Sequence, residues 1–297
     1  MAINFKELPD KELIYGLKTC QGCAATIAAR LALKIIGERT CMGMTASCFG
    51  ATTTVYPQSS LFLNSANSAF PAGAANVSGM AAGARALGWD EDITMLAFIG
   101  DGGTIDIGLQ ALSGAAERND NMIYICYDNE AYMNTGNQRS GVTPFKARTT
   151  TTPTGTCSQG EKNKYRKSLF EIMAAHRLSY VATASTSYPR DYMEKVAKAK
   201  SYKGCKVIHV TAPCPTGWGF DPARVIEIGK MAVECGLWYL AEYENGEFKL
   251  NYDPEDFKPV DDYFKAQDRF KHLGEEDYRE IEGYREIEWG RLKRRFS

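Results

Sequence analysis

Two sets of side chains in this sequence have the types and spacing for cofactor chemistry, and the first is a set of cysteines. Cys20 and Cys23 form a CxxC motif with a glycine inside it, Cys48 follows 25 residues later, and Cys214 lies between two prolines. A [4Fe–4S] cluster needs four thiolates and accepts a distant ligand beside a proline, so these cysteines fit one. A thioredoxin-like dithiol at a helix N-terminus stays open. A structural zinc site also stays open, although the three histidines are scattered.

The other five cysteines are predicted to be buried and to behave as small hydrophobic residues. Cys126 lies inside an apolar strand and Cys235 inside an apolar helix, and burial is the default for Cys41, Cys157 and Cys205. Disulfides are disfavoured in a reducing compartment, so pairing is not the expected explanation of nine cysteines.

The second set is a glycine-rich turn with an aspartate, followed 28 positions later by an asparagine. Gly100, Asp101, Gly102 and Gly103 end one predicted strand, and Asn129 closes the next. Glycines allow a phosphate to approach the backbone, and the helix that follows offers free N–H groups. Asp101 and Asn129 supply hard oxygen ligands of the kind that Mg²⁺ takes together with phosphates and water. The spacing does not match the GxGxxG pattern of a nicotinamide site, so we predict a magnesium–diphosphate site.

These residues need a βαβ unit to bring them together. Residues 93–99 are predicted as a buried strand, 100–104 as a tight turn, 107–118 as a helix and 122–127 as a second strand. The two strands should be parallel, and ligands bind at the carboxyl ends of such strands.

The remaining pattern predicts an α/β fold, an open and mainly parallel sheet with helices on both faces. Residues 51–70 are expected to hold a strand with loops, and 131–160 to form a long irregular segment. The cations in 161–167 are expected to form a solvated face. Further predicted helices are 23–37, 71–88, 169–176, 191–199 and 225–235, and further predicted strands are 180–184 and 206–211.

Composition excludes some classes of protein. The chain has 297 residues, a net charge of −1 and 44% hydrophobic residues, which does not suggest a nucleic-acid-binding polycation. Its apolar stretches are too short to cross a membrane, and its N-terminus lacks a secretory signal, so we expect a cytoplasmic protein.

We divide the chain into an N-terminal segment 1–50 that belongs to the main domain, an α/β domain 51–240, and a charged C-terminal region 241–297. The C-terminal region is expected to form an arm or a terminal helix that packs on a neighbour.

Residues 100–144, GDGGTIDIGLQALSGAAERNDNMIYICYDNEAYMNTGNQRSGVTP, closely resemble the β subunit of pyruvate and 2-oxoisovalerate:ferredoxin oxidoreductases. The CxGC near the N-terminus, the single Cys48, PCPTGW at 213–218 and KAQDRFKHL at 265–273 resemble the same family. The resemblance therefore covers most of the chain and implies the thiamine diphosphate-binding fold.

The resemblance also implies functions for individual residues. Cys20, Cys23, Cys48 and Cys214 would ligate a [4Fe–4S] cluster near thiamine diphosphate. Asp101, the Asn129 side chain and the Ala131 carbonyl would ligate Mg²⁺. Asn134 would lie beside the thiazolium and the substrate, with Thr135 as a neighbouring cofactor-binding residue. Tyr132 is expected to pack rather than to catalyse.

The sequence departs from relatives at positions near these residues. Ala24, Ala25 and Thr26 replace a GCGE-like run after the CxxC, and Phe49 and Gly50 replace a common Met–Glu. The HGR segment of 2-oxoglutarate and indolepyruvate relatives is missing, while 60–80 loosely resembles the pyruvate-type segment. A pyruvate-type substrate is favoured, and oxalate, branched-chain and aryl 2-oxoacids stay open.

The family implies oxidative decarboxylation of a 2-oxoacid, with electrons passing to ferredoxin and typically with coenzyme A as the acyl acceptor. It also implies that a partner subunit supplies the glutamate that activates the pyrimidine ring, so this chain alone should be inactive. The alternatives are a non-redox thiamine diphosphate-dependent decarboxylase or synthase subunit and a zinc-binding structural subunit.

Overall fold

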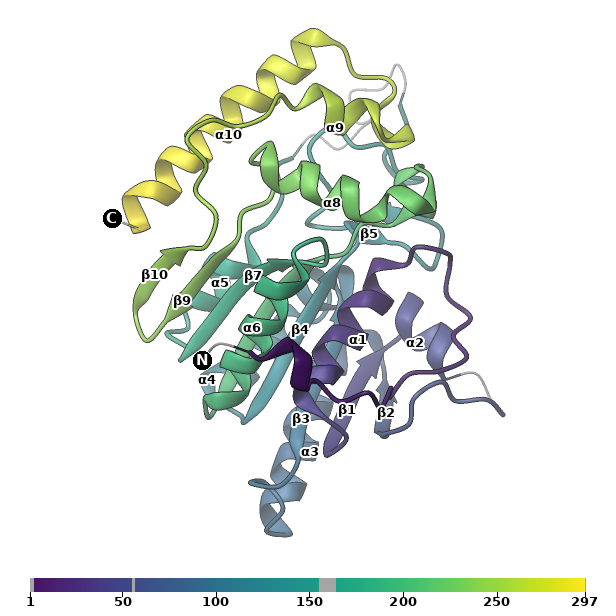
Figure 1. The fold of residues 1–297 in the computed structure, drawn as a ribbon, viewed down its shortest axis with the longest axis vertical. Helices are drawn as coiled ribbons and strands as arrows, with labels where there is room; N and C mark the ends of the chain where they lie inside the picture. Colours follow the sequence, from purple (N-terminus) through teal and green to yellow (C-terminus); the bar gives the residue numbers. More distant parts are fainter. Residues whose placement is uncertain (1–2, 55–56, 155–163, 297) are drawn as a thin grey trace.

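A twisted eight-stranded sheet, with the strand order β10-β9-β7-β8-β4-β3-β1-β2, forms the centre of the molecule (Figure 1). The computed structural model describes residues 3–54, 57–154 and 164–296. The strands of this sheet are β1 (Thr40–Thr45), β2 (Asn64–Ser68), β3 (Thr94–Gly100), β4 (Met122–Asp128), β7 (Tyr180–Ser185), β8 (Cys205–Thr211), β9 (Ala241–Glu244) and β10 (Glu247–Leu250), and β5 (Ala131–Tyr132) pairs with β6 (Gln138–Arg139) in a separate hairpin.

The strands from β7 to β2 are parallel, and β9 and β10 extend one edge in antiparallel pairs. The pairing of β3 with β4, from Leu96 opposite Ile123 to Gly100 opposite Tyr127, confirms the predicted βαβ unit. Because side chains alternate along a strand, each strand contributes to both faces of the sheet. The mainly parallel α/β fold is therefore as predicted.

Helices cover both faces of the sheet. On one face α1 and α6 pack against Leu96 and Phe98, and on the other α3, α4 and α5 pack against Ala97 and Ile99. A third apolar cluster joins α8 and α9 to Trp218 and Phe270. The α-helices are α1 (Ala24–Ile36), α2 (Cys48–Thr53), α3 (Gly73–Ala86), α4 (Leu109–Glu117), α5 (Leu169–Ala174), α6 (Pro189–Ser201), α7 (Pro215–Trp218), α8 (Val225–Glu234), α9 (Asp261–Lys265) and α10 (Glu275–Phe296). The 3₁₀ turns are η1 (Phe5–Glu7), η2 (Phe70–Ala72), η4 (Pro222–Arg224) and η5 (Asp268–Phe270), and η3 (Gly102–Asp106) is a π-helical turn.

Two predicted elements differ from the structure around the expected site. Residues 51–53, the start of the segment 51–70 predicted as a strand with loops, instead belong to the short helix α2. The Ser47 hydroxyl caps this helix by accepting a hydrogen bond from the Gly50 N–H at 3.2 Å. The turn after β3 is η3, closed by an Ile107 N–H to Gly102 carbonyl hydrogen bond of 3.2 Å, so α4 begins later than expected. Single π-helical turns of this kind are frequent at functional sites.

The C-terminal residues contribute to the sheet and to its cover. Ala241–Leu250, assigned to the charged arm, supplies β9 and β10, and the terminal helix is α10. In Figure 1, α10 runs along one end of the molecule near α8 and α9, and the Trp289 indole donates to the Gly236 carbonyl at 2.7 Å. The helix thus packs on its own chain. Within the described residues, no helix has the length and apolar character of a membrane span.

Candidate functional site

A cleft lies at the carboxyl ends of β3 and β4, where ligands bind in open parallel sheets. All the residues predicted to bind the cofactor line it, although they come from two separate stretches of the chain. Cys48, at the start of α2, lines the same cleft. The predicted cofactor-binding residues in its wall are Gly100, Asp101, Gly102, Gly103, Asn129, Ala131, Asn134 and Thr135.

Three oxygen-bearing groups converge in this cleft. One end of the Asn129 side-chain amide lies 2.9 Å from the Ala131 carbonyl oxygen and 3.1 Å from an Asp101 carboxylate oxygen. With the amide nitrogen at that end, it donates to both oxygens. Rotating the amide by half a turn would bring three oxygens together, an arrangement that a bound cation would stabilise. Neighbouring ligands of an octahedral Mg²⁺ with bonds of 2.0–2.1 Å are about 2.9 Å apart. The donor set therefore fits a magnesium ion.

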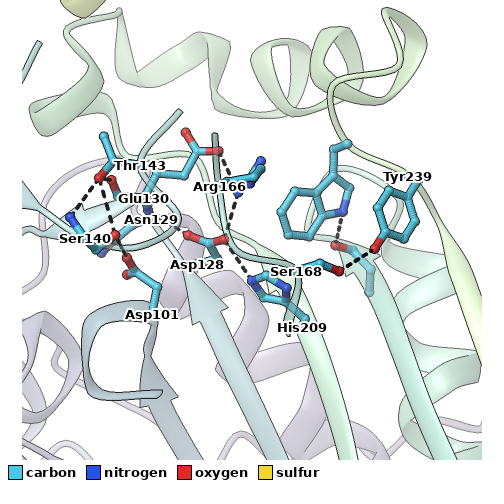
Figure 2. A network of polar contacts seen from close by, with 12 residues as sticks. Asp101, Asp128, Asn129, Glu130, Ser140, Thr143, Arg166, Ser168, His209 and Tyr239 are labelled. Carbon is cyan, nitrogen blue, oxygen red and sulfur yellow. Dashed lines mark hydrogen bonds and ion pairs between the residues drawn. The ribbon is translucent and has the colours of Figure 1, made fainter. Parts of the chain in front are cut away.

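Asp101 is a buried carboxylate without a cationic partner. It is 1% exposed, and no lysine, arginine or histidine in the described part of the chain forms an ion pair with it. The Ser140 hydroxyl donates to its Oδ2 at 2.6 Å (Figure 2). Burial raises the pKa of Asp101 well above its ordinary value, and the charges of Asp128 and Glu130 raise it further. A divalent cation would supply the missing positive charge.

Gly102 is required where the chain turns out of β3. A Cβ at this position would lie 2.5 Å from the ring of Tyr132, which packs directly over the backbone. The Tyr132 hydroxyl also donates to the Gly102 carbonyl at 3.2 Å. Tyr132 thus packs on the glycine turn, in agreement with the packing role predicted for it.

Three of the four predicted cluster ligands lie at helix starts. Cys23 is the N-cap of α1, Cys48 is the first residue of α2, and Cys214 is the N-cap of α7. The Gly217 N–H donates to the Cys214 sulfur at 3.3 Å. This hydrogen bond lowers the pKa of Cys214, but burial outweighs it.

The four cysteines come from distant parts of the sequence and lie in one region. Burial raises the pKa of Cys48 to about 12, and charges on Cys214, Cys23 and Cys20 contribute to that shift. Burial likewise raises the pKa of Cys214 to about 11. Gly22, inside the CxxC loop, has a φ of +66°, and a Cβ there would lie 2.6 Å from the Pro222 carbonyl oxygen.

The close approach of Gly22 to Pro222 brings the CxxC loop against the segment that follows Cys214. In the described residues, however, no group of three or more His, Cys, Asp or Glu side chains is gathered tightly enough to hold a metal ion. The thiols are therefore electrostatic neighbours whose sulfur atoms would have to draw closer around a cluster.

Three of the remaining five cysteines are buried as predicted, and Cys41 is less buried than predicted. Cys126, Cys205 and Cys235 are buried, and Cys41 is half-buried. Cys157 lies outside the described residues.

Sequence reasoning missed a network of buried charges behind the cleft (Figure 2). Asp128, fully buried at the end of β4, accepts a hydrogen bond from His209 at 2.8 Å and forms an ion pair with Arg166 at 3.0 Å. Burial alone would raise the pKa of Asp128, but the hydrogen bond and charge of His209 and the charge of Arg166 lower it. The prediction that the cations of 161–167 form a solvated face is wrong for Arg166, which pairs with this buried carboxylate. The sequence signal for this network was His209, a polar residue inside the apolar strand β8.

Two motifs meet directly behind Asn129. The indole N–H of Trp218, from PCPTGW, donates to the Asn129 carbonyl at 2.9 Å. The guanidinium of Arg269, from KAQDRFKHL, stacks on the Trp218 ring with its carbon 3.8 Å from the ring centroid. The second half of the chain thus supports the loop that carries two of the predicted magnesium ligands.

Comparison with known proteins agrees with this geometry. Residues 39–210 match the family described as thiamine pyrophosphate enzyme, C-terminal TPP binding domain. Pyruvate synthase subunit PorB of Methanothermobacter thermautotrophicus is 51% identical over 277 residues, which cover 93% of this chain and 96% of that protein. The chain belongs to the β-subunit family of 2-oxoacid:ferredoxin oxidoreductases.

Two further relatives and one solved structure are also similar to this chain. Ketoisovalerate oxidoreductase subunit VorB of Pyrococcus horikoshii is 42% identical, with 96% of this chain and 93% of that protein covered. Pyruvate synthase subunit PorB of Thermotoga maritima is 40% identical, with 95% and 91% covered. A solved 2-oxoglutarate:ferredoxin oxidoreductase from Magnetococcus marinus shares the fold, with a TM-score of 0.57 at 17% identity over 77% of this chain and 84% of that one.

Proposed function

We propose that this chain is the subunit of a 2-oxoacid:ferredoxin oxidoreductase that binds thiamine diphosphate, Mg²⁺ and one [4Fe–4S] cluster. One observation carries the proposal: the Asn129 side-chain amide meets the Ala131 carbonyl and the Asp101 carboxylate in a cleft that Cys48 also lines. A redox enzyme of this class needs its cluster close to the organic cofactor, because electrons must pass between them.

The chain's own residues have distinct tasks in this proposal. Asp101, Asn129 and Ala131 hold Mg²⁺ and through it the diphosphate, and Gly102 and Gly103 let the diphosphate approach the backbone. When bound, thiamine diphosphate supplies the electron sink through which a 2-oxoacid loses CO₂.

The thiazolium end is assigned to the part of the cleft that Asn134 and Thr135 line. These two residues would position the reacting part of the cofactor. Cys20, Cys23, Cys48 and Cys214 would hold the cluster that accepts the electrons.

For the substrate we propose pyruvate or a close analogue. Two of the relatives described above are named as pyruvate synthase subunits, and one as a ketoisovalerate oxidoreductase subunit. We infer that ferredoxin accepts the electrons, that coenzyme A accepts the acyl group, and that further subunits complete the enzyme. Reduction of a viologen dye by the anaerobic complex, with pyruvate compared with branched-chain and aryl 2-oxoacids, tests the substrate.

Metal and sulfide analysis tests the cofactor assignment. The complex is purified anaerobically, and iron, acid-labile sulfide, zinc and thiamine diphosphate are measured per chain. We expect Cys48→Ala to lower iron and sulfide by the equivalent of one cluster per chain. The matched variant Cys126→Ala, at a buried cysteine in β4, should retain them. Thiamine diphosphate without iron would indicate a non-redox enzyme, and zinc without thiamine diphosphate would indicate a structural subunit.

A further inference from the structure

Glu130 stands between the two predicted magnesium ligands of the loop after β4 and has an unusual backbone. Its φ is +64°, in the left-handed region that non-glycine residues seldom occupy. Asn129 directs its side chain and Ala131 its carbonyl toward the same point, so the conformation of Glu130 sets their relative orientation. Strained backbone of this kind persists only where its surroundings hold it in place.

Two arginines hold the Glu130 carboxylate. It is 3% exposed, and its oxygens lie 2.7 Å from Arg269 Nη2 and 3.2 Å from Arg166 Nη2. A carboxylate buried to this extent is costly unless it is paired. The two ion pairs therefore fix its side chain on the side of the loop away from Asp101.

Hydrogen bonds hold the backbone on both sides of Glu130. Its N–H donates to Asp128 Oδ1 at 2.8 Å, and its carbonyl accepts from the Thr143 hydroxyl at 2.6 Å. Trp218, under the Arg269 guanidinium, donates to the preceding carbonyl, that of Asn129, at 2.9 Å. Figure 2 shows Asp128, Glu130, Thr143 and Arg166 around this loop.

Of the three buried carboxylates in this region, Asp128 and Glu130 have cationic partners within the described residues, and Asp101 is left to bind a cation. Asp128 pairs with Arg166 and His209, and Glu130 pairs with Arg166 and Arg269, whereas Asp101 has no cationic partner in the described residues. Neutralising Glu130 would leave surplus positive charge behind the loop, and this charge would oppose the binding of Mg²⁺.

We propose that Glu130, clamped by Arg166 and Arg269, is a positioning residue that sets the affinity of the site for Mg²⁺. It does not contact the metal; it holds Asn129 and Ala131 in the orientation that binds it. This inference rests on the proposed magnesium–diphosphate function. Loss of a residue that orients metal ligands typically weakens metal binding roughly 10- to 100-fold.

The test is Glu130→Gln in the anaerobically purified complex. Pyruvate-dependent viologen reduction is measured at saturating thiamine diphosphate over a range of Mg²⁺ concentrations. We expect the half-saturating Mg²⁺ concentration to rise roughly 10- to 100-fold, with the maximal rate recovered at high Mg²⁺. Iron content should be unchanged. Mn²⁺, titrated into the complex in place of Mg²⁺ and followed by electron paramagnetic resonance, gives a direct measure of binding.

The matched control is Glu242→Gln, which removes another buried and ion-paired glutamate far along the sheet, in β9. This variant should lose thermal stability and keep the wild-type requirement for Mg²⁺. If Glu130→Gln does not fold, Arg269→Lys tests the clamp instead, because it keeps the charge and loses the planar stacking on Trp218. It should raise the Mg²⁺ requirement by a smaller factor.

The outcomes separate the two proposals. A wild-type complex that binds thiamine diphosphate without any divalent cation would overturn the magnesium–diphosphate function itself. A Mg²⁺-dependent wild type whose Glu130→Gln or Arg269→Lys variants keep the wild-type Mg²⁺ requirement would overturn the clamp alone. A reduced maximal rate that high Mg²⁺ does not restore would also count against positioning.

Discussion

At the scale of single residues, the site is defined by a charge that the chain leaves unpaired. Asp101 is buried beside Asp128 and Glu130, yet both arginines of the region pair with those two carboxylates. A folded chain tolerates such a residue only at a cost to stability. The cost indicates that Asp101 serves the binding of a cation.

Replacing Asp101 by asparagine should therefore separate function from stability. We expect Asp101→Asn to abolish Mg²⁺-dependent binding of thiamine diphosphate and to raise the melting temperature of the complex in EDTA. A gain of 1 kcal/mol corresponds to roughly 2–4 °C in a domain of this size. Isothermal titration of thiamine diphosphate and calorimetry in EDTA measure the two effects.

The control for this substitution is a half-buried aspartate that does have a partner. Asp191 pairs with the buried Lys195 at 2.7 Å, so Asp191→Asn should lower the melting temperature and leave cofactor binding intact. Equal destabilisation by Asp101→Asn and Asp191→Asn would contradict the assignment of Asp101 as the unpaired charge.

The glycine turn allows a second test at a single residue. In Gly102→Ala the new methyl group would lie 2.5 Å from the Tyr132 ring, so this ring, which lines the cleft, must shift. We expect at least a tenfold weaker affinity for thiamine diphosphate, which corresponds to about 1.4 kcal/mol. Gly283→Ala in α10, where a Cβ meets no atom within 4 Å, should leave binding unchanged. Wild-type affinity in Gly102→Ala would mean that Tyr132 does not limit the cleft.

At the scale of elements, the hydrophobic pattern of the sequence predicted the strands and helices that depend mainly on that pattern. The strands β3 and β4 are continuous apolar runs, and their parallel pairing follows from the helix between them. The turn η3 and the helix α2 escaped prediction because tight packing and a serine cap, rather than hydrophobic periodicity, determine them.

The candidate site, like the fold, could be predicted only in part from the sequence. Asp101 and Asn129 follow strands and could be located, whereas the partners of Glu130 could not. Arg166 and Arg269 lie 36 and 139 positions further along the chain, and such pairings are established only by the folded arrangement. The same holds for the position of β9 beside β7, where Glu242 of β9 accepts hydrogen bonds from Tyr180 and Lys198.

The hydrogen bonds around Glu242 should make the stability of the β9 edge depend on pH in the acid range. Burial alone would raise the pKa of Glu242, but hydrogen bonds from Lys198, Tyr180 and Asn251 outweigh it and lower the pKa to about 2. A carboxyl group with a lowered folded-state pKa adds stability that is complete above its unfolded value of 4.5. This stability is lost as the pH falls from 4.5 towards 2.

Glu242→Gln should accordingly be less stable than the wild type by about 3 kcal/mol at neutral pH, with the difference shrinking as the pH falls below 4.5. Urea unfolding of the two proteins at several pH values measures it. Glu247→Gln, at an exposed glutamate of the neighbouring strand β10, serves as the control and should show no difference at any pH. A difference for Glu242→Gln that does not depend on pH would exclude the carboxylate as its origin.

At the scale of the whole molecule, the cleft that we propose as the cofactor site lacks groups that thiamine diphosphate chemistry needs. Among the described residues that line it, Asp101 is the only carboxylate, and there is no lysine, arginine or histidine. With Asp101 assigned to the metal, no acid remains to activate the pyrimidine ring. No cation is present to receive the carboxylate of a 2-oxoacid. We therefore expect both groups to come from a partner subunit.

The isolated chain should therefore bind the cofactors without turning over substrate. After reconstitution with iron, sulfide, Mg²⁺ and thiamine diphosphate, we expect pyruvate-dependent viologen reduction at least about 10³-fold below that of the complex, since positioned acid–base groups alone contribute 10²–10⁴-fold. Adding the separately purified partner subunits should restore the rate, and adding them to the Asp101→Asn chain should not. Turnover by the chain alone at a rate close to that of the complex would show that the groups lining this cleft are sufficient.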